Sequence, residues 1–313
     1  MKGIDGHRTG HDFSGGHAML FKNRPDGTYI KVPSFKKVLT YTCPTRDEAS
    51  LYYKDTIVMD AAIAMLLKEN RGKSAEDRIN IMHLLVASYI RTVVERPLVN
   101  TFVSGHSFYQ RNEISFSFVA KKELTDEGTE GLVKVCFQPY DTVHRVAGRM
   151  RCAIEEGKSD KGSSSEREVE FLMSMPQPLV SAFMWLYKLL DASNLLPGFL
   201  IGNDPSYSTG LITNLGSIGI DGVFHHLFNW GNSGMIMAIG KIKKAPVNDN
   251  RSGLARIAYV LDIYMTLDDR LADGTYYGNT LKTFKGYMEN PERLFEPPSF
   301  TKEQIDALKL KRP

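Results

Sequence analysis

Two glycine-punctuated stretches decide how this sequence folds: Leu211–Gly219, which reads LITNLGSIG, and Thr266–Gly274, which reads TLDDRLADG. The first is an apolar strand that ends in the hydroxyl and amide side chains of Thr213 and Asn214. Glycines such as Gly216 follow, and they let backbone approach a ligand closely. The second stretch comes between a long apolar strand and a helix, and it groups carboxylates around one arginine. Taken alone, each stretch is more often a tight turn or a charged loop than a binding site.

The pattern of apolar residues around these stretches predicts strands and helices that intermix without strict βαβ alternation. Period-two patterns predict strands at 36–42, 50–58, 102–104, 107–110, 114–118, 132–137, 210–213, 235–241 and 255–266. Helical spacing predicts helices at 61–70, 81–95, 142–156, 166–190 and 276–289. The sequence therefore indicates a mixed α/β (α+β) fold, with one mixed β-sheet covered by helices.

Several residues predict where these elements begin, end or face solvent. Asp60 is a candidate N-cap for the first helix, and Gly72 follows it where a left-handed residue is favoured. Asn80 is a candidate N-cap for the second helix, which must stop before Pro97. Serines alternate with apolar residues in 114–118, which predicts a strand with one face in water.

The composition is that of a globular protein with a packed core. Of 313 residues, 42% are hydrophobic and 24% charged, which fits neither a disordered chain nor a membrane protein. The 39 Lys and Arg nearly balance the 36 Asp and Glu, so nucleic acid is not expected as the main partner. No signal peptide and no apolar run of about 18 residues is visible, so we expect neither export nor membrane insertion.

Cysteine and histidine spacing argues against disulfides and metal. Cys43, Cys136 and Cys152 are odd in number and have no CxxC spacing, which predicts a reducing, cytoplasmic location without a disulfide framework. The near-terminal histidines show no standard zinc spacing, so no metal site is expected there. These histidines are His7, His11 and His17.

The chain divides into three parts by composition. Residues 1–30 are rich in Gly and His and predict an irregular N-terminal arm. Residues 31–295 form the main domain, and the polar run GKSDKGSSS at 157–165 indicates a solvated linker inside it. Residues 296–313 form a tail, in which a capping box at Thr301–Gln304 predicts a short helix with its apolar residues on one side. These apolar residues are Ile305, Leu308 and Leu310.

Four motifs in order along the chain resemble the catalytic domain of the dihydrolipoamide acyltransferases of 2-oxo acid dehydrogenase complexes. That family carries T-I-S-N-L-G-x-x-G, which Leu211–Gly219 resembles. It then carries D-H-R-x-x-D-G, a helix and L-x-N-P-E, which Thr266–Gly274 and YMENPERLF at 287–295 resemble. MIMAIGKIKKAPV at 235–247 resembles its A-I-L-G-V-G-R-I strand, and the helical stretch 78–100 resembles the helix that ends in Y-P-E-L-N.

This resemblance extends over about residues 58–295 and implies a chloramphenicol acetyltransferase-like fold in a homotrimer, which in the family often assembles into cages. It implies an active-site channel between subunits, entered by coenzyme A and by dihydrolipoamide from opposite ends. The motif histidine is the general base for the thiol, and a hydroxyl matching Thr213 donates to the oxyanion. The aspartate matching Asp273 is implied to hold the site through an arginine, for which Arg270 is the candidate. Asn214 and Gly216 are implied to line the substrate site.

The sequence departs from the family at the residue that matters most, because Asp269 stands where the family has histidine. A free carboxylate with a pKa near 4 is about four units too acidic to deprotonate a thiol well. Losing a positioned general base typically costs a factor of about 10² to 10⁴. Asp269 regains basicity only if Asp268 and Asp273 crowd it in a dry channel. Otherwise another residue must act as the base. His225 and His226 are the candidates for that replacement, although a histidine pair here is more often structural.

These observations lead to two functional hypotheses. The first is a weakly active or inactive acyltransferase-fold protein, a pseudoenzyme with a scaffold or acyl-CoA-binding role. The alternative is an active coenzyme A-dependent acyltransferase that uses a substitute base on a free acceptor. Asn229 matches a family asparagine near the substrate. Coenzyme A is the expected ligand. No covalent lipoyl group is expected, because the stretch before Lys31 is too short for a lipoyl or subunit-binding domain. Expected partners are further copies of the chain and 2-oxo acid dehydrogenase components.

Overall fold

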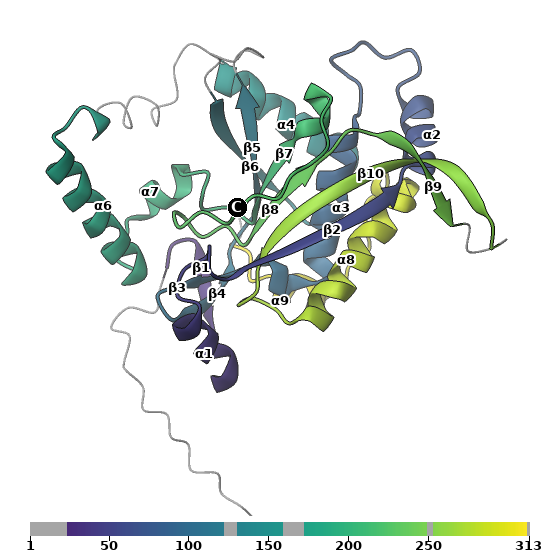
Figure 1. The fold of residues 1–313 in the computed structure, drawn as a ribbon. Helices are drawn as coiled ribbons and strands as arrows, with labels where there is room; N and C mark the ends of the chain where they lie inside the picture. The colour runs from purple at the N-terminus through teal and green to yellow at the C-terminus, as the bar shows by residue number, and fades with distance from the viewer. Residues whose placement is uncertain (1–23, 122–129, 159–171, 249–252, 312–313) are drawn as a thin grey trace, which may run out of the picture.

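The computed structural model describes residues 24–121, 130–158, 172–248 and 253–311 (Figure 1). Its main feature is a seven-stranded mixed sheet in the order β2-β10-β8-β7-β5-β6, with β9 paired to β10. Pairings of β7 with β5 and β8 are parallel, and the others are antiparallel. The strands are β2 (Ser50–Val58), β5 (Ile114–Lys121), β6 (Glu130–Phe137), β7 (Gly210–Asn214), β8 (Met235–Ile239), β9 (Lys243–Asn248) and β10 (Ala255–Asp268). The mixed sheet that the sequence predicts is confirmed.

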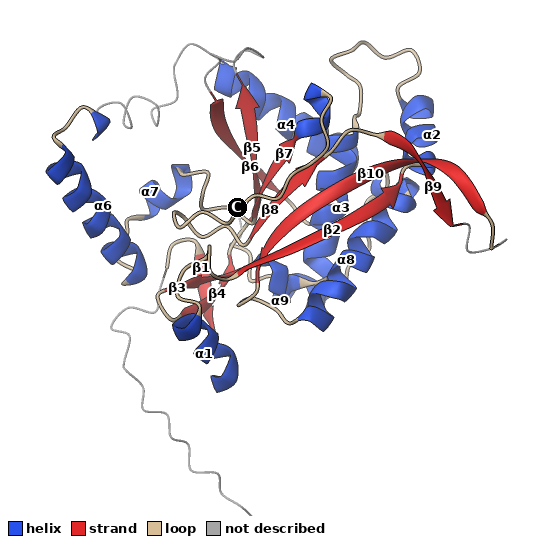
Figure 2. Cartoon of the chain, in the orientation of Figure 1, coloured by secondary structure: helices blue, strands red, loops and turns tan. Residues whose placement is uncertain are grey.

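Helices pack against this sheet and one another to form the main core (Figure 2). Helix α3 contacts α4 and α8, and α8 contacts α2 and β2. None of the described helices is long and apolar enough to span a membrane. The α-helices are α1 (Ser34–Thr42), α2 (Asp60–Glu69), α3 (Ile81–Glu95), α4 (Val143–Lys158), α6 (Gln177–Ala192), α7 (Gly198–Asn203), α8 (Gly274–Glu289) and α9 (Lys302–Ala307). The 3₁₀ turns are η1 (Pro97–Asn100), η2 (Leu215–Ile218) and η3 (Pro291–Leu294).

The central helix α3 has the boundaries that its sequence predicts. The Asn80 side chain accepts the backbone N–H of His83, and the His83 ring accepts the N–H of Asn80, which completes a capping box. Every residue from His83 to Val94 is buried, because sheet and helices surround this helix. Gly72 has the predicted left-handed backbone, with φ 76°. The cap predicted for α2 is wrong: the N-cap is Met59.

Asp60 instead occupies the first turn of α2 and reaches out of it. Its carboxylate accepts the backbone N–H of Tyr259 at 2.9 Å and pairs with Arg256 at 2.6 Å. The bond to Arg256, and after it the hydrogen bond from the Tyr259 N–H, lower the pKa of Asp60 below its usual value. The carboxylate therefore joins α2 to β10 rather than capping its own helix.

A second sheet of three strands, in the order β1-β4-β3, lies below the main one in Figure 1. The sequence predicts its hairpin correctly, but not its first strand, and the strand predicted at 36–42 is helix α1. The reason is that Phe35, Val38 and Tyr41 are three residues apart, which places them on one helical face. Tyr41 stacks on His106 with ring centres 4.0 Å apart. The strands are β1 (Gly27–Ile30), β3 (Thr101–Ser104) and β4 (Ser107–Arg111).

The serine face of β5 is buried, which corrects the prediction of a solvated face. Ser115 and Ser117 are both 0% exposed. The Ser117 hydroxyl donates to the Pro205 carbonyl at 2.6 Å, and the N–H of Ser115 donates to the Thr209 hydroxyl at 3.1 Å. A segment of irregular chain around 204–209 therefore covers this face, and small hydroxyl side chains are needed to satisfy its polar groups.

Both ends of the described chain pack onto the body. Residues 24–30 enter the small sheet, whereas the rest of the predicted arm, with its three histidines, lies outside the described residues. The predicted capping box at Thr301–Gln304 is confirmed, and α9 brings Leu308 into the core, where it is 0% exposed. The 157–165 linker lies outside the described residues except for Gly157 and Lys158, which end α4.

Helix α6 is apolar on nearly all sides and yet projects from the body (Figure 1). The helix predicted at 166–190 is confirmed over 177–190 only, because the chain is not helical at 174–176 and Pro176 is the N-cap of α6. Of the residues in α6 only Tyr187 is buried. Trp185 is 66% exposed and Leu186 47% exposed. The sequence predicts these side chains to be buried or to face an interface, and within one chain they are not buried. Large apolar surfaces of this kind usually mark an interaction site.

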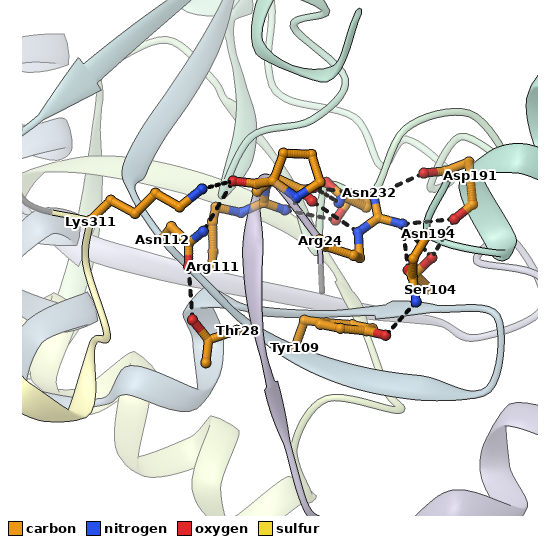
Figure 3. A network of polar contacts seen from close by, with 12 residues as sticks. Arg24, Thr28, Ser104, Tyr109, Arg111, Asn112, Asp191, Asn194, Asn232 and Lys311 are labelled. Carbon is orange, nitrogen blue, oxygen red and sulfur yellow. Dashed lines mark hydrogen bonds and ion pairs between the residues drawn. The ribbon is translucent and has the colours of Figure 1, made fainter. Parts of the chain in front are cut away.

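Arg24 holds the C-terminal end of α6 against the small sheet (Figure 3). Its fully buried guanidinium pairs with Asp26 at 2.9 Å and with Asp191 at 2.8 Å. It also donates to the Ser104 hydroxyl at 2.6 Å and to the Asn194 amide oxygen at 3.2 Å. Burial alone would lower the pKa of Arg24, but the two carboxylates outweigh it and raise this pKa above its usual value. One arginine therefore connects β1, β3 and α6.

Replacing this arginine is expected to destabilise the protein strongly. Arg24→Gln removes the paired cation from two largely buried carboxylates, Asp191 and Asp26, and leaves only Arg111 near Asp26, which typically costs about 3 kcal/mol or more. The free energy of unfolding, measured by denaturant titration, should fall by about that amount, and hydrogen exchange should accelerate in α6. The exposed Arg145→Gln on α4 is the control and should change stability by less than about 0.5 kcal/mol. Equal effects of the two substitutions would contradict the role given to Arg24.

Candidate functional site

The two motifs lie at separate places on the sheet. Thr213 in β7 pairs with Ala238 in β8, which pairs with Tyr264 in β10. Asp269 follows Tyr264 by five residues, at the turn between β10 and α8. At about 3.3 Å per residue along a strand and 4.8 Å between strands, Thr213 and Asp269 are roughly 20 Å apart in one chain. A single copy therefore does not bring the predicted oxyanion donor to the predicted base position.

A buried ion pair fixes the turn at the end of β10. The guanidinium of Arg270 binds both carboxylate oxygens of Asp268, at 2.8 and 2.7 Å, and the two side chains are 4% and 3% exposed. The remaining Arg270 nitrogen donates to the carbonyls of Cys43 and Pro44 at 3.2 and 3.1 Å. The Tyr277 hydroxyl donates to the Asp268 carbonyl at 2.7 Å. This ion pair thus joins β10, α8 and the 43–50 loop.

Asp269 is exposed, and its carboxylate forms no hydrogen bond or ion pair with the described residues. Its backbone N–H donates to the Ala49 carbonyl at 2.9 Å. Asp273 is also exposed, and its carboxylate accepts the Tyr276 N–H at 2.8 Å as the N-cap of α8. Arg270 pairs with Asp268 rather than with Asp273, in contrast to the arrangement that the resemblance implies. One chain therefore does not provide the dry, crowded carboxylate cluster that would make Asp269 more basic.

The 43–50 loop gathers the other candidates near this turn. The amide oxygen of Asn229 accepts the backbone N–H groups of Arg46 and Asp47 at 3.0 and 3.2 Å. His226 is exposed, and its Nδ1 lies 3.6 Å from a carboxylate oxygen of Asp47. His225 is half-buried, and its backbone carbonyl accepts the Thr266 hydroxyl. Asn229 therefore has a structural role here, and His226 is the histidine with a carboxylate beside it.

The first motif forms a tight turn after β7. The Asn214 amide oxygen accepts the Ser217 N–H at 3.2 Å and so caps η2. At Gly216 an added Cβ would overlap the Gly240 carbonyl, so glycine is needed for this close packing of two backbone segments. Thr213 is half-buried, and its hydroxyl makes no hydrogen bond with the described residues. The tight-turn interpretation therefore accounts for Asn214 and Gly216, and Thr213 stays available to a ligand.

A cavity of about 380 Å³ lies beside the Asp268–Arg270 pair, and no motif in the sequence predicts it. Its lining comes from the 44–46 loop, the turn between β3 and β4, the C-terminal half of α6, the 229–231 segment and Arg270. One signal was available: Thr45 and Glu48 have capping-box spacing, and each side chain accepts the other's backbone N–H, which makes this loop an ordered turn. Cavities of this size commonly bind metabolites. Within the described ranges, no group of three His, Cys, Asp or Glu side chains is arranged to hold a metal ion.

Comparisons with known proteins agree with this fold. Residues 200–296 match the family model of the 2-oxoacid dehydrogenases acyltransferase (catalytic domain), a range that contains both motifs. No curated protein sequence matches the chain. A probable dihydrolipoamide acetyltransferase from Listeria monocytogenes aligns with a TM-score of 0.54 at 11% identity, over 83% of this chain and 94% of that one. The stretch 78–100 lies outside the family match.

Two further solved structures are similar to the same extent. The cubic core of the pyruvate dehydrogenase multienzyme complex has a TM-score of 0.56 at 13% identity, over 85% of this chain and 93% of its own. The Azotobacter vinelandii dihydrolipoamide acetyltransferase has a TM-score of 0.54 at 14% identity, over the same shares. Over residues 200–296 the resemblance to the catalytic domain of the 2-oxo acid dehydrogenase acyltransferases is therefore confirmed, and the chain as a whole has the chloramphenicol acetyltransferase-like fold.

The contact between Asn229 and the 43–50 loop can be tested through stability. Asn229→Ala removes one acceptor from two backbone N–H groups and should lower the free energy of unfolding by about 1 kcal/mol, as the loss of a helix cap does. Asn229→Asp keeps an acceptor oxygen and should stay close to the unsubstituted protein. Denaturant titration of both variants checks this, and equal losses in both would contradict the assignment.

Proposed function

We propose that this chain is an acyltransferase-fold protein that assembles with copies of itself and has lost most of the thiol-acylating activity of the fold. The observation that carries the proposal is Asp269, an exposed carboxylate at the end of β10, where the resembled family has its general base. In sequence, Arg270 and Asp273 match the residues of the family motif that follow the histidine, and Thr213 keeps the hydroxyl of the other motif. A scaffold or acyl-CoA-binding role follows from a retained fold with an altered base.

The comparison with the Azotobacter protein supports this interpretation. In that enzyme a serine, a histidine and an asparagine have been investigated for roles in catalysis. By motif, Thr213 keeps the hydroxyl of the serine, Asp269 replaces the histidine, and Asp273 takes the third position. A carboxylate is a weaker base than the imidazole it replaces, and a thiol with a pKa near 8.5 needs a stronger one. The rate of proton removal at neutral pH is therefore expected to be low.

Self-assembly is supported by the separation of the site residues and by α6. Because Thr213 and Asp269 are roughly 20 Å apart in one chain, they can share a site only if different copies supply them. The exposed apolar residues of α6, such as Trp185 and Leu186, form the type of surface that association buries. We favour a homotrimer with coenzyme A or an acyl-CoA as its ligand. Further assembly into a cage, association with 2-oxo acid dehydrogenase components and a cytoplasmic location stay predictions.

One contact favours a second candidate, an active coenzyme A-dependent acyltransferase on a free acceptor. The His226 ring has the Asp47 carboxylate 3.6 Å from its Nδ1, and the same loop binds the backbone of Asp269 through Ala49. A carboxylate beside an imidazole orients it and supports its action as a base. Under this alternative, His226→Ala abolishes acyl transfer and Asp269→Ala does not.

Restoring the histidine tests the main proposal. Asp269→His should raise acyl transfer from acetyl-CoA to dihydrolipoamide by about 10² to 10⁴-fold, the usual contribution of a general base. Adding Thr213→Val should remove most of this gain, because the hydroxyl would no longer donate to the oxyanion. Asp306→His on the surface of α9 is the control and should change nothing. Family-like turnover by the unsubstituted protein, with no loss on replacing Asp269, would contradict the proposal.

The role of α6 in association is testable by mass. Leu186→Glu places a charge on the exposed apolar helix and should shift the mass in solution from an oligomer towards a monomer, because burying an unpaired charge is costly. Leu67→Glu on α2 replaces another exposed leucine, 72% exposed against 47% for Leu186, and should leave the mass unchanged. Analytical ultracentrifugation measures both. An oligomer that tolerates Leu186→Glu as well as Leu67→Glu would rule out α6 as the interface.

A further inference from the structure

We propose that the cavity beside the Asp268–Arg270 pair binds a small organic anion, a planar molecule that carries a carboxylate or a phosphate, and that Arg46 is the residue that recognises the negative charge. Its volume of about 380 Å³ suits a molecule of metabolite size. This site is separate from Thr213 and does not require acyl transfer. The inference therefore goes beyond the proposed function and can be tested independently of it.

The charges around the cavity are unequally matched. The carboxylate of Asp268 is bound at both oxygens by Arg270, and that of Asp191 is paired with Arg24 at 2.8 Å. Arg46, in contrast, forms no ion pair with any described residue, and its guanidinium makes one long hydrogen bond of 3.4 Å, to the Trp230 carbonyl. Arg46 is partly buried, and a partly desolvated cation without a paired anion is unfavourable, so an anionic ligand would reduce that cost.

The surroundings of Arg46 support this assignment. Burial lowers its pKa to about 10, although the carboxylates of Asp268 and Asp191 oppose this effect and Arg270 adds to it. The nearby carboxylates thus do not compensate fully for the lost hydration of the guanidinium. The backbone of Arg46 is held by Asn229 at 3.0 Å, so the side chain starts from a fixed position. A preorganised cation of this kind binds an anion with little loss of conformational entropy.

Part of the cavity lining, next to Arg46, is aromatic and rigid. The rings of Tyr187 and Trp230 stack with centres 4.4 Å apart and planes 25° apart. The Trp230 indole N–H donates to the Asp204 carboxylate at 2.7 Å, which fixes the ring. Gly231 follows Trp230 with φ 70°, and a Cβ at this position would overlap the Ser206 carbonyl. Position 231 must therefore be glycine for Trp230 to take this position. A flat apolar body fits such a wall better than a flexible polar chain.

A guanidinium fork matches carboxylate and phosphate oxygens equally well in geometry, which is why the class includes both anions. Lys188 also lines the cavity and forms no ion pair within the described part of the chain, so the local charge favours an anion further. Lysine alone would not define the ligand, because its ammonium acts as a point charge. The directional part of the recognition therefore rests on Arg46.

The test uses the full chain and three probes of similar shape: benzoate, phenyl phosphate and neutral benzamide. Isothermal titration calorimetry should detect binding of at least one anion at concentrations up to about 10 mM, with benzamide at least tenfold weaker. Arg46→Gln should weaken the anion by about tenfold or more, since hydrogen bonds to charged groups are among the stronger ones. Arg46→Lys keeps the charge without the fork and should give an intermediate loss. The surface variant Arg145→Gln on α4 is the matched control and should bind like the unsubstituted protein.

Comparison of the two anions identifies the source, because tighter binding of benzoate indicates a carboxylate ligand and tighter binding of phenyl phosphate a phosphate ester. Circular dichroism and thermal unfolding confirm that each variant is folded, and Arg46→Lys covers the case in which Arg46→Gln is not. Absence of binding by both anions, equal binding of benzamide, or an affinity that Arg46→Gln and Arg46→Lys both leave unchanged would overturn the proposal. None of these outcomes depends on whether Asp269→His restores acyl transfer.

Discussion

The buried ion pair between Asp268 and Arg270 is the interaction on which this end of the molecule depends. It closes the turn between β10 and α8. The Arg270 nitrogen that does not contact Asp268 donates to the carbonyls of Cys43 and Pro44 in the 43–50 loop. That loop in turn positions Arg46 beside the cavity and receives the backbone of Asp269 at Ala49. Breaking a buried pair of this kind typically costs about 3 to 5 kcal/mol, because one charge is left without a partner. A strong structural requirement therefore preserves the arginine whether or not catalysis survives.

Much of the fold could be predicted from the sequence, because local signals and packing agree there. The boundaries of α3 are predicted correctly from the cap at Asn80 and the proline that follows the helix. The position of strand β5 is predicted correctly from its alternating pattern. The errors arose where tertiary contacts decide. Helix α1 forms where period-two spacing predicted a strand, because its apolar residues also fit a helical face. The serines of β5 are buried because a segment about 90 residues away in sequence covers them, and no local pattern records that contact.

The candidate site was only partly predictable for a similar reason. The motifs make Thr213, Asp269 and Arg270 candidates, which stays a prediction, and they do not show that Asp273 caps α8 or that Arg270 pairs with Asp268. Arg46 carries no motif of its own, and its importance appears only when the loop, α6 and the 229–231 segment enclose one cavity. A motif marks residues that are close together in sequence, whereas a cavity forms where segments that are distant in sequence pack together.

The central claim is that a retained acyltransferase pocket forms between copies, with a carboxylate in the position of the base. The most direct test is a cryo-electron microscopy structure of the assembled full-length chain. The account predicts that Asp269 of one copy faces Thr213 of a neighbouring copy across a shared channel, at a distance much shorter than the roughly 20 Å within a chain. A monomer, or an assembly in which these two residues remain on separate outer surfaces, would contradict it.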